Sequence, residues 1–479
     1  MTLKLYNTLT RRQEEFEPLI SGKVKMYYCG VTVYDYCHLG HARACIVWDV
    51  VRRYLQFLGY QVRYVQNFTD IDDKILNRAR QENSSMQEVA EKYIQAYFED
   101  MARLNVKEAD EYPRATHTID GIKRLIHELE QKDCAYAAEG DVYYKVRSFA
   151  EYGKLSGRKL EDMQAGASKR VDAADPEEQR KQDPFDFALW KAAKPGEPAW
   201  ESSWGAGRPG WHIECSAMVR DRLGETIDIH AGGADLIFPH HENEIAQSEA
   251  VTGKPLARYW LHNGMVTVDD EKMSKSLRNF ITIRELLERP IDPMAVRLFV
   301  LMAHYRKPID FSDRALESAQ NGWQTLKEGL VFGLRYGKQL GWSSNGKPSS
   351  EAVERFQAAV NDDFNFSSGL TVLFEIAKEL NKEANILVHQ GKTETPAQQL
   401  ETMWHTLVKL ADVLGLEAQL EAQAPASNGL SDAEIEELVQ MRSQARKAKN
   451  FAESDRIRNE LQAQGITIID NPEGSRWHR

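Results

Sequence analysis

The sequence predicts an α/β fold: a parallel sheet whose strands are joined by helices, followed by an α-helical bundle and a small mixed α+β domain. Short apolar and aromatic runs alternate with stretches of helical spacing along the first third of the chain, as parallel strands and their connecting helices do. Helical spacing is then nearly continuous from residue 293 to about residue 416, which predicts the bundle. A further run of helical spacing near the C-terminus, followed by a short β-like run, predicts the mixed domain.

The first strand and helix patterns flank a short polar segment. An apolar run at 26–29 predicts a strand that Gly30 breaks, and helical spacing from His41 predicts a helix that ends at Gly59. Residues 61–67 alternate as a second strand, and a polar segment follows it, at the edge where a doubly wound sheet binds its ligands. The next predicted elements are helices at 86–104 and 116–132, a hairpin at 134–146 and a charged loop at 161–182.

The sheet resumes in the middle of the chain. Its remaining strands are predicted at 211–215, 227–230 and 259–268. Pro239 suits a first helical turn, so a helix is predicted to open there. Ala, Pro, Ser, Asn and Gly concentrate at 421–431, which predicts a linker. The elements predicted after this linker are a basic helix at 433–464, broken near Phe451, and a strand at 466–469.

These patterns divide the 479 residues into several parts. The predicted parts are a Rossmann-like domain in two halves, 1–132 and 201–255, with an insertion at 133–200, then a junction at 256–312, the helical bundle at 313–420, the linker at 421–431 and the C-terminal domain at 432–479.

The composition argues against several classes of protein. No apolar run approaches the length of a membrane span, and the N-terminus lacks the apolar core of a signal peptide, so we expect a cytoplasmic protein with no membrane partner. A net charge of −11 argues against unspecific binding of a polyanion such as DNA but allows a local basic surface for one shaped RNA. We expect a monomer. The cysteines are too few and scattered for a disulfide scaffold: Cys29, Cys37, Cys45, Cys134 and Cys215.

A candidate phosphate site lies at the start of the first helix. The predicted strand, loop and helix place His38 and His41 at a helix N-terminus, where unpaired backbone N–H groups favour an anion and Gly40 allows its close approach. Far downstream, Lys272 and Lys275 place two ammonium groups on one loop. On the residues alone, a His-x-x-His pair beside a helix start is more often explained by helix capping or surface polarity than by phosphate binding.

Together the two motifs have a known counterpart. The segment His38-Leu-Gly-His41 and the segment Lys272-Met-Ser-Lys-Ser276 resemble the two signatures of class I aminoacyl-tRNA synthetases. The resemblance implies that His38, Gly40, His41, Lys272 and Lys275 bind ATP, and that all of them except Gly40 act in catalysis. Two departures from the usual signatures are Leu39 in place of Ile and Arg278 in place of Gly. The first is a mild apolar change, whereas the second replaces a residue that is free to adopt a positive φ.

A candidate metal site involves His240 and Glu244, which are four residues apart in a helical pattern and so project from one face. For Cys29 and Cys215, simple burial remains open on the residues alone. However, Cys29-Gly, Trp211-His-Ile-Glu-Cys and Pro239-His-His-Glu-Asn-Glu together resemble the cysteinyl family of class I synthetases, and this resemblance extends over nearly the whole chain. It implies one zinc ion held by Cys29, Cys215, His240 and Glu244, with the substrate thiolate as an added ligand.

The same resemblance implies the substrates and the remaining contacts. The reaction would be the ligation of L-cysteine to tRNA(Cys) through a cysteinyl-adenylate, with ATP and magnesium. The implied amino-acid pocket consists of Thr69, Trp211, His230 and Asp235, although core packing remains open for Trp211. The implied anticodon contacts are Arg446, Phe451 and Asp455, although a basic helix is often only a solvated face.

Two alternatives remain open. A related cysteine ligase joins cysteine to an amino sugar on a similar zinc and ATP site, but such enzymes lack a C-terminal RNA-reading domain, which this chain is predicted to have. A synthetase-like binding paralogue would keep the fold without catalysis, and the intact Cys, His and Lys positions argue against it.

Overall fold

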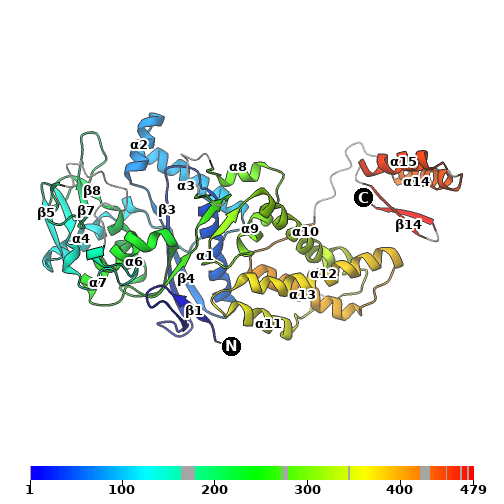
Figure 1. Cartoon of the computed structure of the whole chain (residues 1–479), viewed down its shortest axis with the longest axis horizontal. Helices are drawn as coiled ribbons and strands as arrows, with labels where there is room; N and C mark the ends of the chain where they lie inside the picture. The colour runs from blue at the N-terminus through cyan, green and yellow to red at the C-terminus, as the bar shows by residue number, and fades with distance from the viewer. Residues whose placement is uncertain are drawn as a thin grey trace. The chain divides into compact units, whose positions relative to one another are not determined.

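The computed structural model describes residues 2–162, 179–269, 271–272, 279–342, 346–420, 432–448, 450–463, 466–471 and 474–478. It contains two compact units (Figure 1). The first unit consists of Met1–Gln324, Ser349–Phe374 and Val408–Glu417. The second consists of Thr325–Pro348, Glu375–Leu407 and Ala418–Arg479.

A four-stranded parallel sheet forms the centre of the first unit, as the sequence predicts. Its strand order is β10–β9–β3–β4, with β3 at Lys23–Thr32, β4 at Gln61–Thr69, β9 at Ile227–Gly233 and β10 at Ala257–Asn263. The helices that connect these strands include α1 at Leu39–Phe57, α6 at Trp211–Leu223 and α7 at Glu242–Thr252. Because all four strands run the same way, their carboxyl ends share one edge, and residues from both halves of the sequence meet there.

The strand β3 continues through the predicted break. Gly30 lies inside β3, and the register between β3 and β4 shifts between Tyr28 and Val31, as in a β-bulge. A Cβ atom on Gly30 would lie 2.0 Å from the backbone oxygen of Asn67. Glycine is needed here because the two backbones approach closely, and so it does not end the strand.

The segment 211–215, predicted as a strand, is the first turn of helix α6. Gly210 occupies the N-cap position, and the helix continues to Leu223. Its residues from Ile213 to Val219 are all buried. Because no face of the helix is exposed there, apolar residues do not recur in the sequence with helical spacing. A helix that is buried on every side gives no periodic signal, which explains the wrong prediction.

Two further boundaries differ from the prediction. Pro239 lies in a separate turn, Ile237–His241, after a cis peptide bond, and helix α7 begins only at Glu242. The segment 259–268 is two strands, because β10 ends at Asn263 and a short strand β11 follows. The strand β11, at Val266–Val268, belongs to another sheet, in which it pairs with β12 (Glu271–Lys272) and β13 (Ile309–Phe311).

The predicted helices at 86–104 and 116–132 are confirmed as α3 and α4, and the predicted hairpin as β5–β6. The predicted loop at 161–182 lies mostly outside the described residues. Among the described residues up to Val360, the other elements are β1 (Lys4–Asn7), β2 (Arg12–Glu15), α2 (Asp73–Glu82), α3 (Met86–Arg103), η1 (Ala115–His117), α4 (Ile119–Gln131), β5 (Ala135–Ala138), β6 (Asp141–Tyr144), η2 (Val146–Ser148), η3 (Leu160–Asp162), β7 (Phe187–Ala192), β8 (Gly207–Pro209), η4 (Ala234–Leu236), β12 (Glu271–Lys272), α8 (Ile283–Glu288), α9 (Pro293–Leu301), β13 (Ile309–Phe311), α10 (Asp313–Tyr336) and α11 (Ser350–Val360). The strands β5–β6–β7–β8 form an antiparallel sheet within the predicted insertion.

Helices dominate the chain from Phe366 onward. The long helices here are α12 (Phe366–Gln390) and α13 (Ala397–Val413). The C-terminal part contains α14 (Asp432–Lys447) and α15 (Phe451–Ala463), which confirms the predicted break near Phe451. The predicted last strand is confirmed as β14 (Thr467–Asn471), and it pairs in an antiparallel hairpin with a second strand that was not predicted, β15 (Gly474–His478). These elements have a core of their own, made of Ile435, Val439, Ile457, Leu461 and Ile466.

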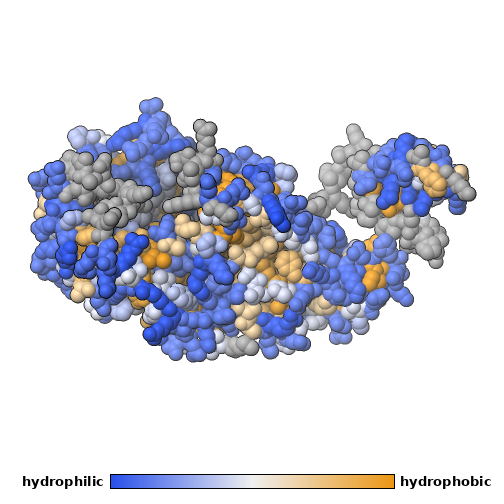
Figure 2. All heavy atoms as spheres, viewed as in Figure 1, coloured by the Kyte–Doolittle hydropathy of each residue, from blue (hydrophilic) through white to orange (hydrophobic). Residues whose placement is uncertain are grey.

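The face seen in Figure 2 is largely hydrophilic, with apolar side chains in small groups between polar ones. Among the described residues, no helix is both long enough and apolar enough to span a bilayer.

Candidate functional site

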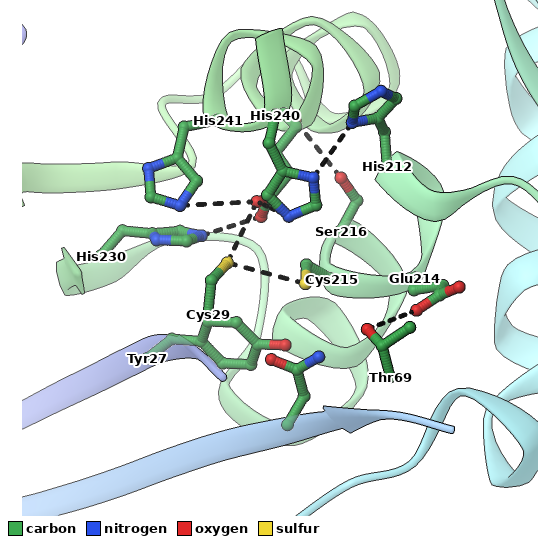
Figure 3. Close-up of polar contacts among 12 residues, drawn as sticks. Tyr27, Cys29, Thr69, His212, Glu214, Cys215, Ser216, His230, His240 and His241 are labelled. Atoms are coloured by element: carbon green, nitrogen blue, oxygen red, sulfur yellow. Dashed lines mark hydrogen bonds and ion pairs between the residues drawn. The ribbon is translucent and has the colours of Figure 1, made fainter. Parts of the chain in front are cut away.

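Four predicted metal ligands meet beside the central sheet. Figure 3 labels three of them, Cys29, Cys215 and His240. Cys29 comes from β3, Cys215 from α6, His240 from the turn before α7, and Glu244 from α7 itself. One donor atom of each lies within 4.8 Å of the others, and all four side chains are buried. Residues from both halves of the sheet are therefore needed to form this site.

The distances between the donor atoms fit one tetrahedral ion. The two sulfur atoms are 3.6 Å apart, and Nε2 of His240 lies 3.1 Å from Oε1 of Glu244. Ideal tetrahedral zinc would separate two thiolates by about 3.8 Å, and an imidazole nitrogen from a carboxylate oxygen by about 3.4 Å. Both cysteines are free thiols. The four side chains thus lie close to the arrangement that zinc requires, and thiolate with imidazole is the donor set that zinc prefers.

The electrostatics of the thiols also favour a cation. Burial, together with the neighbouring Cys215 and Glu244, raises the pKa of the Cys29 thiol. The hydrogen bond from Cys29 lowers the pKa of Cys215, but burial and the carboxylate of Glu244 outweigh it, and the pKa is raised overall. Without a cation, both thiols would stay protonated at neutral pH, whereas a bound metal ion deprotonates its thiol ligands.

Neighbouring rings hold these ligands in place. Nε2 of His230 is 2.8 Å from Oε2 of Glu244, and the ring of His230 stacks on Trp260 at 4.4 Å. Nδ1 of His240 lies 3.0 Å from Nδ1 of His212, and Trp211 stacks on the ring of His240 at 4.0 Å. Such contacts orient metal ligands and tune their basicity. His230 and Trp211, which the sequence predicts for the amino-acid pocket, therefore both touch predicted ligands.

The other two predicted pocket residues are less directly connected to this cluster. Thr69, at the carboxyl end of β4, donates a hydrogen bond of 3.0 Å to Glu214, the residue before Cys215. Burial raises the pKa of the Glu214 carboxyl well above its usual value. Asp235 is exposed in the short turn η4, next to the carboxyl end of β9.

The two histidines that are predicted to bind phosphate lie at the start of α1. His38 is the N-cap residue, and its Nδ1 accepts a hydrogen bond from the backbone N–H of Gly40. Nδ1 of His41 accepts from the backbone N–H of His38, and the two rings stack at 3.7 Å. Burial, with the neighbouring His38 and Lys74, lowers the pKa of His41 well below its usual value. Because Nδ1 accepts in each ring, a neutral ring carries its proton on Nε2, where it can donate to a phosphate oxygen. Capping and phosphate binding are thus compatible.

The chain that follows the lysine motif forms backbone hydrogen bonds beside the histidine motif. The backbone N–H of Leu39 donates to the oxygen of Ile281, and the N–H of Ile283 donates to the oxygen of Cys37. The backbone of Lys272 pairs with Thr267 in the strands β12 and β11. The side chain of Lys272 and the whole of Lys275 and Arg278 lie outside the described residues.

The predicted anticodon residues lie on the two C-terminal helices. Arg446 is in the last turn of α14. Phe451 is the first residue of α15, and its side chain is 62% exposed. Asp455 is exposed one turn later on the same face as Phe451. An exposed ring at a helix start is available for stacking.

One residue of the two possible donor groups, His241, and its neighbour His262 were not found from the sequence. His241 and His262 are 2.8 Å apart through Nδ1 and Nε2, and both are buried. Cys29, His230, His241 and Glu244 form a second group of donors that shares two members with the first. The pair His240-His241 gives a local signal for this group, but nothing in the sequence connects it with His262.

Family models match three parts of the chain. Residues 15–321 match the model described as the class I (C) catalytic domain of tRNA synthetases, and residues 355–419 match the DALR domain. Residues 429–477 match the model described as the cysteinyl-tRNA ligase anticodon binding domain. The chain therefore belongs to the class I aminoacyl-tRNA synthetases.

Curated relatives define the family more closely. The chain is 70% identical over 486 residues to the cysteine–tRNA ligase of Gloeothece citriformis (strain PCC 7424), with all of both chains covered. It is 66% identical over 486 residues to that of Nostoc sp. (strain PCC 7120), again over all of both chains. Within its class, the chain is a member of the cysteine–tRNA ligase family.

More distant solved structures share the fold. A putative arginyl-tRNA synthetase from Campylobacter jejuni superposes with a TM-score of 0.55 at 14% identity, covering 84% of this chain and 94% of that one. A methionyl-tRNA synthetase from Mycobacterium tuberculosis, solved with methionyl-adenylate, gives 0.53 at 15% identity, covering 82% and 89%. At such low identity these structures support the fold alone, and they agree with the predicted parallel-sheet class.

Proposed function

We propose that this chain joins L-cysteine to tRNA(Cys) through a cysteinyl-adenylate, using ATP with magnesium. The observation that carries the proposal is the buried donor set of Cys29, Cys215, His240 and Glu244, placed at the ligand-binding end of the sheet in a chain of this family. The C-terminal match to an anticodon-binding model favours tRNA over an amino sugar as the acceptor. We further propose that the protein acts as a monomer in the cytoplasm, without DNA or membrane partners.

The donor set supports selection of cysteine by its sulfur. A zinc ion held by these four side chains would deprotonate and bind the substrate thiol, an interaction that a hydroxyl makes poorly. A hydrophobic pocket alone separates near-isosteres by only about 10- to 200-fold. His230 keeps Glu244 in position, and Trp211 packs on His240, so both residues would fix the geometry of the ligands. Thr69 and Asp235 are proposed to bind the amino-acid backbone of the substrate.

The start of α1 supports the adenylation step. The substrate carboxylate attacks the α-phosphorus of ATP, and pyrophosphate leaves. This step depends on alignment and charge stabilisation more than on a protein nucleophile. His38 and His41 would donate from Nε2 to the phosphates, Gly40 would allow close approach, and Lys272 and Lys275 would neutralise the developing charge. In the second step, the terminal ribose hydroxyl of the tRNA attacks the carbonyl carbon of the adenylate, an ester bond forms, and AMP leaves.

Cysteine-dependent exchange of pyrophosphate into ATP tests this proposal directly. Exchange that requires cysteine, is absent with serine and is followed by charging of added tRNA would support it. Exchange without tRNA charging would favour the amino-sugar ligase. No exchange in metal-replete protein would favour a binding paralogue.

Lys275→Ala is expected to slow adenylate formation by roughly 100-fold while cysteine affinity stays within about twofold, because a cation that stabilises the leaving pyrophosphate acts chiefly in the transition state. Single-turnover measurement of adenylate formation, with calorimetric titration of cysteine, checks this. Lys254→Ala is the control, since Lys254 is an exposed lysine paired with Glu225. An unchanged single-turnover rate for Lys275→Ala would remove Lys275 from the ATP site.

A further inference from the structure

Arg43 is a completely buried cation on α1, two residues after His41. Among the described residues it has no carboxylate partner. Its Nη1 donates to the backbone oxygen of Met265 at 2.6 Å, and its Nη2 donates to the oxygens of Tyr305, at 3.1 Å, and Lys307. One side chain thus binds three carbonyl groups from two separate segments.

These carbonyls lie where the strands β11 and β13 begin to pair. The N–H of Gly264 donates to the oxygen of Tyr305 at 2.8 Å, and the N–H of Ile309 donates to the oxygen of Met265 at 3.0 Å. The segments are so close that a Cβ atom on Gly264 would lie 2.4 Å from the oxygen of Lys307. Arg43 therefore connects α1 to two closely packed chain segments, 264–265 and 305–307, which we call the crossing.

The segment that contains Met265 continues along the chain into the second phosphate motif, which begins at Lys272. The strand β11 pairs with β12 through Thr267 and the backbone of Lys272. On the other side of the motif, the segment around Thr282 pairs with His38 at the start of α1. The chain is thus attached to the first turns of α1 both before and after residues 273–278.

Burying a guanidinium against neutral carbonyls is costly compared with burying an apolar side chain of similar size. Burial lowers the pKa of Arg43 to about 10, so it remains a cation at neutral pH. Its planar guanidinium holds three carbonyls at fixed positions through Nη1 and Nη2, which an apolar side chain cannot do and the rotatable ammonium of a lysine would do less firmly. This arrangement provides defined spacing at no gain in stability over an apolar packing, although removing Arg43 alone would leave the three carbonyls without their donor and destabilise the fold.

We propose that Arg43 is a positioning residue for adenylate formation, holding the strand pair β11–β12 at a fixed distance from the helix start that carries His38 and His41. The inference rests on the proposed function, because it assumes that both motifs act on one ATP molecule. Because Arg43 is completely buried, its effect would pass through the backbone of Met265, Tyr305 and Lys307.

The test compares Arg43→Met with Arg297→Met in the full-length, metal-loaded protein. Arg297 is equally buried and donates to the backbone oxygens of Leu414, at 2.7 Å, and Leu104, at 3.0 Å, away from the second motif. Unlike Arg43, it also pairs with a buried carboxylate, that of Asp49, so Arg297→Met is expected to lower the melting temperature at least as much as Arg43→Met does. Both variants are expected to lower the melting temperature. Only Arg43→Met is expected to lower kcat/KM for ATP in pyrophosphate exchange, by roughly 10- to 100-fold, since a displacement of about 1 Å can cost 100-fold.

Zinc content and cysteine affinity separate a positioning effect from general damage, and we expect both to be unchanged in Arg43→Met. Arg43→Lys, which keeps the charge but not the planar donors, should be intermediate. If Arg43→Met does not fold, Gly264→Ala displaces the same crossing while leaving Arg43 in place, and it should show the same loss for ATP.

Equal loss in the Arg43 and Arg297 variants, or unchanged ATP kinetics in Arg43→Met and Gly264→Ala, would overturn the inference while leaving the proposed function intact. Absence of cysteine-dependent exchange in the unmodified protein would instead refute the proposed function, and the inference with it.

Discussion

Cys215→Ser is expected to remove most of the bound metal and to abolish tight cysteine binding together. A serine hydroxyl is a poor zinc ligand. Removing a residue that only contacts a metal ligand lowers metal affinity by roughly 10- to 100-fold, so replacing the ligand itself should lower metal affinity by more. The substrate thiol then has no ion to bind. Elemental analysis of the purified protein and calorimetric titration with cysteine measure the two losses.

Cys45→Ser provides a matched control for Cys215→Ser. Cys45 is also almost completely buried, but its sulfur lies 3.6 Å from the hydroxyl of Tyr97, in α3, and it belongs to neither donor group. The same chemical change there should leave zinc content and cysteine binding unaltered. If Cys215→Ser retains a full equivalent of zinc, the proposed ligand set is wrong.

Removing the residues after Leu420 is expected to separate adenylation from tRNA charging. The C-terminal helices and hairpin have their own apolar core, and no proposed zinc or ATP residue lies among them. Cysteine-dependent exchange should stay within about twofold. The value of kcat/KM for tRNA charging should fall by roughly 10- to 100-fold, because stacking on an aromatic ring contributes about 1–3 kcal/mol per base.

Single substitutions on the C-terminal helices refine this test. Arg446→Ala and Phe451→Ala should each weaken tRNA charging more mildly than the truncation does. Arg456→Ala is the control, since the Arg456 guanidinium is paired with Glu453 and Glu460 on the same helix. Equal tRNA charging by the truncated and complete chains would rule out an anticodon role for this region.

The parallel sheet could be predicted because its strands and helices differ in apolar spacing. The strand β4 and the helix α3 match their predicted positions closely. The segment 211–215 was misread because α6 is buried on all sides and gives no helical periodicity. The last hairpin was missed because its second strand, Gly474–His478, contains mostly polar residues that do not alternate with apolar ones.

The site was predictable only in part from the residues themselves. His240 and Glu244 are four residues apart, so their shared face follows from local spacing. Cys29 and Cys215 are far apart in the sequence, and only the family resemblance placed them together. The contact between Thr69 and Glu214 depends on how β4 and α6 pack, which no local pattern encodes.

The origin of the four metal ligands has a consequence for folding. Cys29 lies before the predicted insertion, while Cys215, His240 and Glu244 lie after it. An ion at this site would therefore act as a cross-link that closes a long loop of the chain, and it would stabilise the folded state by mass action. Stability would then depend on the free metal concentration, and the melting temperature should fall when a chelator is added. Changes that reshape the ion's surroundings to accept another amino acid would also weaken this cross-link, so altered selectivity and loss of thermal stability would be expected to arise together.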